Sequence, residues 1–309
     1  VWDNVGKMRN RGFEAEVSYN KSINKDFGFN VAFNMSAIKN KMTELDGDVS
    51  YIGLPTSVIH SLNFDQEVSR SAIGQPIGSF YAYKEDGLFQ SEAEIKSYTN
   101  NKGELLQPNA KPGDIKFVDV NGDGVIDGND RDYIGNPLPD VTAGLTLGVN
   151  FHNFDLSLFF QGMFGNDVYD LTRYVGDFYN QSQYNKNSRV VNAWTPTNTN
   201  TDIPRVTMDD PNNNIRPSSY YVQDASFVRL KNMKIGYSVP QSILSKIKFN
   251  SLYIYAQATN LFTITGYDGI DPEVGLQSYS SDYRNLDMGV DRGIYPLSRT
   301  FTFGVNVSF

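Results

Sequence analysis

The amino-acid sequence predicts an all-β fold with about seven antiparallel strands that cross a membrane. Three observations support this prediction: apolar residues alternate with period two, the residues between them are small and polar, and short connections alternate with long ones. No run of 18 apolar residues is present, so a transmembrane helix is not expected. A transmembrane β-strand mixes apolar and polar residues, and the negative mean hydropathy of the chain is compatible with one.

Period-two alternation locates the individual strands. In 27–37, for example, Phe29, Val31 and Phe33 alternate with small residues. The same pattern occurs in 13–20, 141–151 and 301–309, and weaker versions occupy 154–164, 225–239 and 250–262. If these segments span a bilayer, Phe33, Leu147 and Val305 face lipid, whereas Asn34, Thr146 and Asn306 face the lumen.

The residues between the apolar positions argue against a soluble sheet. Thr, Gly, Ser and Asn dominate there, whereas a soluble sandwich normally places Lys and Glu on its solvent face. Small polar residues suit a crowded or water-filled barrel lumen. Aromatic residues make up 13% of the chain, more than a core of this size needs, which also favours a membrane barrel. A large soluble antiparallel sheet remains the alternative.

The connections between strands fall into two classes. Those at 22–26, 152–153 and 240–250 are short, whereas those at 39–140, 165–224 and 263–298 are very long. Compact soluble domains rarely carry loops of such length, but outer-membrane barrels combine short periplasmic turns with long extracellular loops. We therefore assign the short turns to the periplasm and the long connections to the cell exterior. The long connections are expected to be irregular, without strand ladders.

The number of strands indicates that this sequence is part of a larger barrel. Segment 73–83 also has strand character, but one further crossing would break the alternation of sides, so we assign it to the loop. Seven strands cannot close a bacterial barrel, whose strand number is even and at least eight. The first residue is Val1, within an ongoing strand-and-turn pattern and without a signal peptide, so we expect a fragment of a longer chain.

Composition excludes several classes of function. The chain has no cysteine, which excludes disulfide scaffolds and cysteine catalysis, and its two histidines, His60 and His152, are far apart. The net charge of −8 argues against nucleic-acid binding. No carboxylate pair is placed as glycosidases require, and the glycines of 74–87 do not link a strand to a helix as in a phosphate-binding loop. An enzyme is therefore not predicted.

Several segments resemble those of SusC/RagA-type TonB-dependent outer-membrane transporters. The resemblance runs in the same order over essentially all 309 residues and corresponds to the C-terminal third of such a transporter. The matching segments are Gly74–Tyr81, Asp86–Gln90, Pro112–Phe117 with the acidic run after it, Ala193–Pro196, Ile203–Arg205, Asp224–Asn232, Asp268–Glu273 and Arg299–Gly304.

This resemblance implies a barrel of 22 strands in the outer membrane, an internal plug domain and energy supplied by the TonB complex. It also implies a SusD-like surface lipoprotein as partner and a glycan oligomer or a peptide as cargo. The plug and the TonB-contacting segment lie outside this sequence. Two alternatives remain open: a passive outer-membrane porin and a secreted calcium-binding β-sheet adhesin.

A calcium-binding loop is predicted at 119–130, within the long connection 39–140. Oxygen ligands occupy loop positions 1, 3, 5, 9 and 12, and a glycine at position 6 permits the sharp turn. The candidate ligands are Asp119, Asn121, Asp123, the backbone carbonyl of Val125, Asp127 and Asp130. We expect a structural ion that orders 114–134. The alternative is an acidic, glycine-rich turn without metal.

Candidate substrate-binding residues lie in the connection 165–224. Aromatic rings can stack on the apolar faces of sugars, and the candidates are Tyr184, Trp194, Tyr220 and Tyr221. Loop packing or lipoprotein docking explains the same composition and is the favoured alternative. At the C-terminus, Phe309 closes an alternating aromatic strand, which looks like the signal that the barrel-assembly machinery recognises.

Overall fold

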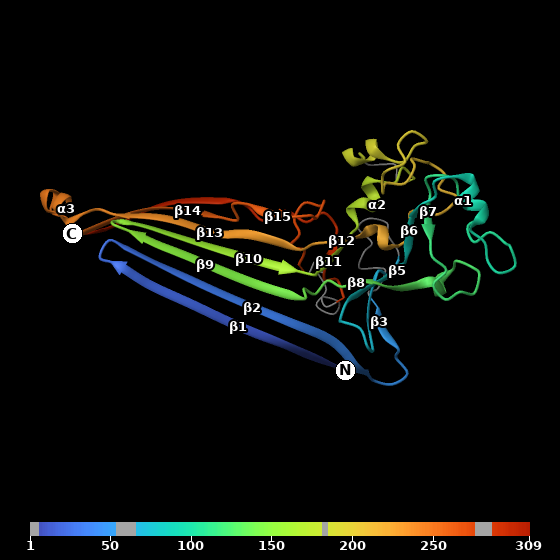
Figure 1. Cartoon of the computed structure of the whole chain (residues 1–309), viewed down its shortest axis with the longest axis horizontal. Helices are drawn as coiled ribbons and strands as arrows, with labels where there is room; N and C mark the ends of the chain where they lie inside the picture. The colour runs from blue at the N-terminus through green and yellow to red at the C-terminus, as the bar shows by residue number, and fades with distance from the viewer. Residues whose placement is uncertain (1–5, 54–65, 181–184, 276–285) are drawn as a thin grey trace, which may run out of the picture.

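The computed structural model describes residues 6–53, 66–180, 185–275 and 286–309 (Figure 1). Within these ranges the regular secondary structure is mostly β, and the α-helices are short: α1 (Glu92–Ser97), α2 (Thr172–Gly176) and α3 (Gln241–Ile247). None of the helices in the described ranges is long and apolar enough to cross a membrane. Figure 1 shows a long sheet with a second region of shorter strands and helices at one end.

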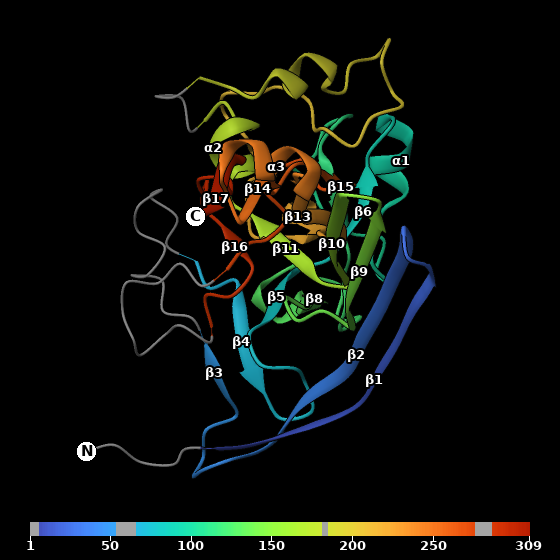
Figure 2. The ribbon, with the colours of Figure 1, turned by 90° about the vertical axis from the view of Figure 1, so that its left-hand side faces the viewer.

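The long sheet, which we call the main sheet, contains the seven predicted strands in sequence order. Each strand pairs antiparallel with the next, as in an up-and-down barrel. The strands are β1 (Gly6–Asn24), β2 (Phe27–Leu45), β9 (Val141–Phe151), β10 (Phe154–Phe164), β13 (Phe227–Ser238), β14 (Ser251–Thr259) and β17 (Thr300–Ser308). Figure 2 shows that the sheet is curved, with β1 and β2 on one flank.

The strand boundaries follow the alternation pattern closely. Strands β9 and β10 begin and end where predicted, whereas β1 and β2 are 19 residues each and extend beyond the alternating segments. The predicted strand 250–262 is interrupted after Thr259, because Asn260 has a φ of 51°. The chain then resumes as β15 (Thr263–Thr265), which pairs with the start of β13.

Strand register gives the main sheet one apolar and one polar face. Directly opposed residues share a face, and successive residues alternate between faces. One row across the sheet is apolar: Tyr19, Val31, Leu147, Leu158, Met233, Ala258 and Phe301. The next row is small or polar: Asn30, Gly148, Ser157, Lys234, Gln257 and Thr302. By the same register, Phe33, Leu147 and Val305 lie on the apolar face and Asn34, Thr146 and Asn306 on the polar face.

Glycines on the polar face accommodate larger neighbours. A Cβ atom at Gly148 would lie 1.9 Å from the Asn30 amide oxygen, and one at Gly304 would lie 2.2 Å from the Tyr255 ring. Each glycine therefore provides the space that a cross-strand polar side chain occupies. This packing explains why glycine recurs at the polar positions of these strands.

The long connections form a second structured region, at the opposite end from the short turns (Figure 1). We call the described residues of 46–140, 165–226 and 266–299 the loop region. It contains a sheet of β3 (Tyr51–Gly53), β4 (Ser69–Ala72), β5 (Ser79–Tyr83) and β8 (Arg131–Gly135), a sheet of β12 (Val222–Asp224), β11 (Asp167–Asp170) and β16 (Val290–Asp291), the pair β6 (Glu85–Leu88) and β7 (Ile115–Phe117), and 3-10 helices at Gly128–Asp130, Ser188–Asn192 and Ser219–Tyr221.

Two predictions about the long connections have different outcomes. The expectation of irregular loops without strand ladders is wrong, because strands from different connections pair, as when β11 pairs parallel with β16. Segment 73–83 does supply a strand, β5, but this strand belongs to the loop region and is not part of the main sheet. Its strand character therefore adds no membrane crossing.

Candidate functional site

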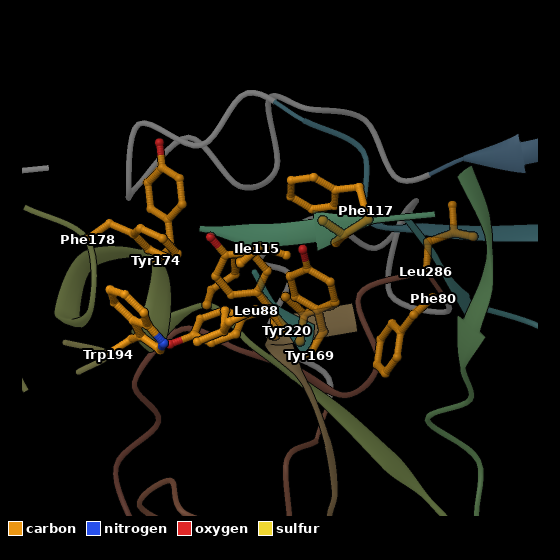
Figure 3. Close-up of a cluster of buried hydrophobic side chains, with 14 residues drawn as sticks. Phe80, Leu88, Ile115, Phe117, Tyr169, Tyr174, Phe178, Trp194, Tyr220 and Leu286 are labelled. Carbon is orange, nitrogen blue, oxygen red and sulfur yellow. The ribbon is translucent and has the colours of Figure 1, made fainter. Parts of the chain in front are cut away.

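The three long connections share one hydrophobic core in the loop region (Figure 3). Rings and aliphatic side chains from all three connections contact one another, and most are almost fully buried. The connection 39–140 contributes Phe80, Leu88, Ile115 and Phe117, 165–224 contributes Tyr169, Tyr174, Phe178, Trp194, Tyr220 and Tyr221, and 263–298 contributes Leu286 and Val290. The loops therefore form one packed unit, with a defined surface that could meet a ligand or a partner.

Asp114 joins two segments that are distant in the sequence. Its side chain is fully buried and forms an ion pair of 2.6 Å with Arg205, and the amide of Asn214 donates to it over 2.9 Å. Beside it, a Cβ atom at Gly113 would lie 2.4 Å from the ring of Trp194, so this ring requires glycine there. Three of the segments that resemble the transporters, Pro112–Phe117, Ala193–Pro196 and Ile203–Arg205, thus contact one another.

A second buried network joins the loop region to the main sheet. Arg229 of β13 is 2% exposed and donates to Asp271 over 2.5 Å and to Glu273 over 3.1 Å. Lys231 donates to Glu273 over 2.6 Å. These contacts give the segments Asp224–Asn232 and Asp268–Glu273 a structural role. The basic residues of the first segment hold the second against the polar face of the sheet.

The structure places the predicted substrate-binding rings in the core and not on a surface. Trp194, Tyr220 and Tyr221 are 7%, 4% and 0% exposed, and Tyr184 lies outside the described residues. The indole of Trp194 donates to Gln90, and the hydroxyl of Tyr220 donates to Asp177 over 2.6 Å. Protein covers these rings, so they offer no free face on which a sugar could stack. Their burial agrees with the loop-packing alternative.

A polar cavity of ≈ 510 Å³ opens in the loop region next to α2. Its charged lining residues are Asp170, Arg173, Arg189 and Asp268, and Asn187, Ser188 and Thr172 supply further polar groups. Arg173 donates to Asp268 over 3.1 Å, and Arg189 donates to Asp202 over 3.2 Å. The arginines are therefore already neutralised by neighbouring carboxylates.

Burial shifts the pKa of one carboxyl group in this cavity. Burial raises the pKa of Asp170 above its ordinary value, while the hydrogen bond from Thr172 and the charge of Arg173 oppose the shift. The lining contains two arginines and two aspartates, so it has no formal net charge when all four are ionised. The cavity thus favours neutral polar groups, such as hydroxyls or amides, over polyanions.

In the structure, the predicted calcium loop is ordered by hydrogen bonds within itself. Asp119 accepts from the backbone N–H groups of Gly122 and Gly124 over 2.8 and 2.9 Å. Asp130 is fully buried and accepts from Val120 over 2.9 Å and from Asp127 over 2.7 Å. Within the described part of the chain, no three acidic or histidine side chains are gathered as a metal site.

The functional candidates that sequence reasoning missed are those of the cavity. Asp268 belongs to a segment singled out for its resemblance, but Arg173 and Arg189 carry no local signal. The cavity forms where 170–173, 187–189 and 268–270 meet, and these segments are up to about 100 residues apart. Only the tertiary structure brings them together.

Comparison with known proteins identifies the class of this chain. It is 37% identical over 307 residues to TonB-dependent receptor P3 of Formosa agariphila and 27% identical over 311 residues to TonB-dependent receptor SusC of Bacteroides thetaiotaomicron. Each match covers 99% of this chain but only 29% and 27% of the relative, so the chain spans less than a third of their length. The chain matches no protein-family model.

Solved structures confirm the fold. The RagAB peptide importer in its open-open state matches 99% of this chain and 29% of that chain, with a TM-score of 0.73 and 23% sequence identity. The relatives are receptors and transporters and not enzymes, in agreement with the prediction. The main sheet is accordingly part of an outer-membrane β-barrel, and the chain is the C-terminal part of a SusC/RagA-type TonB-dependent receptor.

Proposed function

We propose that the full-length protein containing this chain imports an oligomeric nutrient, a glycan fragment or a short peptide, across the outer membrane with energy from the TonB complex. The observation that carries this proposal is the match of 99% of the chain to TonB-dependent receptors, among them SusC. The aligned part is only 27–29% of these relatives, and we propose that the parts that couple to TonB lie in the remainder of the full-length protein.

The packing of the loop region favours a binding partner on the cell surface. Its three connections share one core, so they present a preformed surface to which a partner can bind with little ordering cost. We propose a SusD-like surface lipoprotein as this partner. The barrel-assembly machinery is a second proposed partner, because β17 lies at an edge of the main sheet with Phe301, Phe303 and Phe309 exposed.

The cavity beside α2 is the proposed contact with cargo in this part of the receptor. Ser188 lines it and is exposed, so a large side chain there would fill the space without breaking an ion pair. Ser188→Trp should weaken cargo binding about tenfold, which corresponds to ~1.4 kcal/mol. Ser245→Trp, an exposed change in α3 at the opposite end of the molecule, is the matched control.

Uptake of labelled glycan fragments and labelled peptides by cells measures the proposed function. Cells that carry the full-length protein should accumulate one class of oligomer, and deletion of its gene or of TonB should abolish that uptake. Uptake that continues without TonB would support the passive porin instead. Calorimetry with the purified receptor then compares Ser188→Trp with Ser245→Trp. Equal affinities would remove the cavity from the proposed site.

We propose further that the 119–130 loop binds one structural Ca²⁺. Each carboxylate oxygen has two lone pairs, so Asp119 and Asp123 can accept backbone N–H groups and still bind a cation. The affinity should be modest, on the order of 10⁻⁴–10⁻³ M, as in extracellular modules. The loop is flanked by β7 and β8, which have strand partners, so the expected effect is confined to 119–130.

Limited proteolysis of the full-length protein with calcium and with chelator tests this site. Chelator should increase cleavage within 119–130, and the double variant Asp119→Ala, Asp123→Ala should be cleaved equally in both conditions. Lys96→Ala and Lys102→Ala, which change exposed residues outside the loop, are the control. A cleavage pattern that does not depend on calcium would leave the acidic turn without metal.

A further inference from the structure

Four basic residues form a cluster on one face of β1 and β2. Strand register places Arg9 directly opposite Lys41 and Arg11 directly opposite Lys39. All four are exposed, and within the described residues none of them forms an ion pair. Like charges directly opposite each other on a sheet are destabilising, so the arrangement calls for an anionic partner.

The cluster lies on the apolar face of the main sheet. Two residues further along each strand toward the short turn, Phe13 lies opposite Ala37 on the same face. Val17 lies opposite Phe33 on that face as well. The residues between them point to the other face, where Asn40 bonds to Asn10 over 2.6 Å and accepts from the backbone of Ile77 over 2.9 Å. The loop region therefore contacts the polar face, and the basic cluster points away from it.

The position of the cluster along the strand corresponds to the membrane surface. On β2 the apolar face runs from Phe27 to Ala37, about 33 Å along the strand at ~3.3 Å per residue. A tilt of ~45° reduces this length to about 23 Å across the membrane, close to the ≈ 25 Å apolar band of outer-membrane barrels. Lys39 is the next residue on that face, so it lies at the boundary with the lipid headgroups on the side of the long connections.

The basic cluster is local. At the same end of the sheet, β9 begins at Val141, directly opposite Phe164 at the end of β10, and neither of these strands contains a basic residue. The chain as a whole carries a net charge of −8, so its overall charge does not attract anions. A group of two arginines and two lysines at the headgroup level is suited to phosphate, because guanidinium groups bind phosphate oxygens in bidentate fashion and ammonium groups add point charges.

We propose that Arg9, Arg11, Lys39 and Lys41 form a binding site for the phosphate-bearing headgroup of an outer-leaflet lipid. The bound phosphate relieves the repulsion between the opposed cations and fixes the lipid against the flank formed by β1 and β2 (Figure 2). Basic residues near an anionic membrane surface each add to binding, so the cluster discriminates between phosphorylated and phosphate-free lipid. This proposal depends on the barrel and not on the proposed import.

The test uses the full-length protein in phosphatidylcholine nanodiscs that contain either lipid A or dephosphorylated lipid A. Native mass spectrometry measures how much of each lipid the protein retains. The unaltered protein should retain lipid A about tenfold more than the dephosphorylated form. The quadruple variant Arg9→Gln, Arg11→Gln, Lys39→Gln, Lys41→Gln should lose this preference.

Two control variants distinguish an effect of this site from an effect of overall charge or of misfolding. The variant Lys96→Gln, Lys102→Gln, Lys111→Gln, Lys246→Gln removes the same charge from exposed positions elsewhere and should keep the preference. Arg9→Lys with Arg11→Lys keeps the cluster cationic and should retain most of it. Three outcomes would overturn the proposal: equal retention of both lipids by the unaltered protein, an undiminished preference in the quadruple variant, or loss of preference in the Lys96 set.

Discussion

The main sheet and the loop region are stabilised by different interactions. In the main sheet, continuous backbone ladders hold the strands, and the two faces need only be apolar or small and polar. In the loop region, strands are short, and single buried polar side chains such as Asp114 and Asn214 connect distant segments. The sheet therefore depends on a pattern, whereas the loop region depends on particular residues. Substitutions should distinguish the two regions.

The largest expected effect is at the junction of the two regions. Arg229→Ala leaves Asp271 without its buried cation and leaves Glu273 with Lys231 alone, which should lower the free energy of opening of 263–275 by about 3–5 kcal/mol. Hydrogen exchange of the detergent-solubilised full-length protein measures this opening. Lys231→Ala, which removes only the bond to Glu273, should cost about 1 kcal/mol. Equal effects of the two variants would contradict the central role of Arg229.

Within the main sheet, the effect of a charge should depend on the face that carries it. Leu147→Arg places a charge on the lipid side and should destabilise the barrel by ~2–4 kcal/mol, whereas Thr146→Arg, on the polar side, should be far better tolerated. Refolding of the full-length protein into lipid vesicles at increasing urea concentration measures the difference. Equal destabilisation at both positions is the result expected of a soluble sheet packed on both faces.

Packing in the loop region can be tested with two glycines of similar backbone geometry. Gly113 and Gly103 have φ values of 89° and 81°, but only Gly113 has neighbours within 4 Å, including the Trp194 ring. Gly113→Ala should therefore lower the stability of the loop region by about 1–3 kcal/mol more than Gly103→Ala. Both variants strain the backbone, but only the alanine at 113 is overpacked. Proteolytic susceptibility of the segment around Trp194 reports the loss. Similar susceptibility in both variants would show that backbone strain alone sets the cost.

The smallest expected effect is a pH dependence at the junction. Burial raises the pKa of Asp271, but the hydrogen bond from Arg229 and those from the backbone outweigh it, so the pKa is lowered from its ordinary 3.8. A lowered pKa stabilises the folded form above the unfolded value, and this contribution disappears as the pH falls through the folded value. Hydrogen-exchange protection of 263–275 should stay constant from neutral pH to about pH 4 and then fall. Asp271→Asn should remove this dependence.

The difference between the regions explains what the sequence could predict. Period-two alternation is a local signal, so it located all seven strands and reproduced the bounds of β9 and β10. Pairing in the loop region joins segments more than 100 residues apart, as between β11 and β16, and leaves no local pattern. Rings such as Trp194 and Tyr221 are candidates both for ligand binding and for loop packing, because aromatic and polar residues are common in binding surfaces and in packed loop cores alike. Composition alone does not separate the two.

The apolar and polar faces of the main sheet are the central claim, and one measurement tests them most directly. Because the chain has no cysteine, single cysteines can be introduced at each position of 141–151 in a cysteine-free full-length protein and spin-labelled in lipid vesicles. Accessibility to oxygen, which concentrates in the bilayer, should peak at Ala143, Leu145, Leu147 and Val149 and fall at the residues between them. Accessibility without a period of two, or with its peaks at Gly144, Thr146 and Gly148, would contradict the assignment of faces.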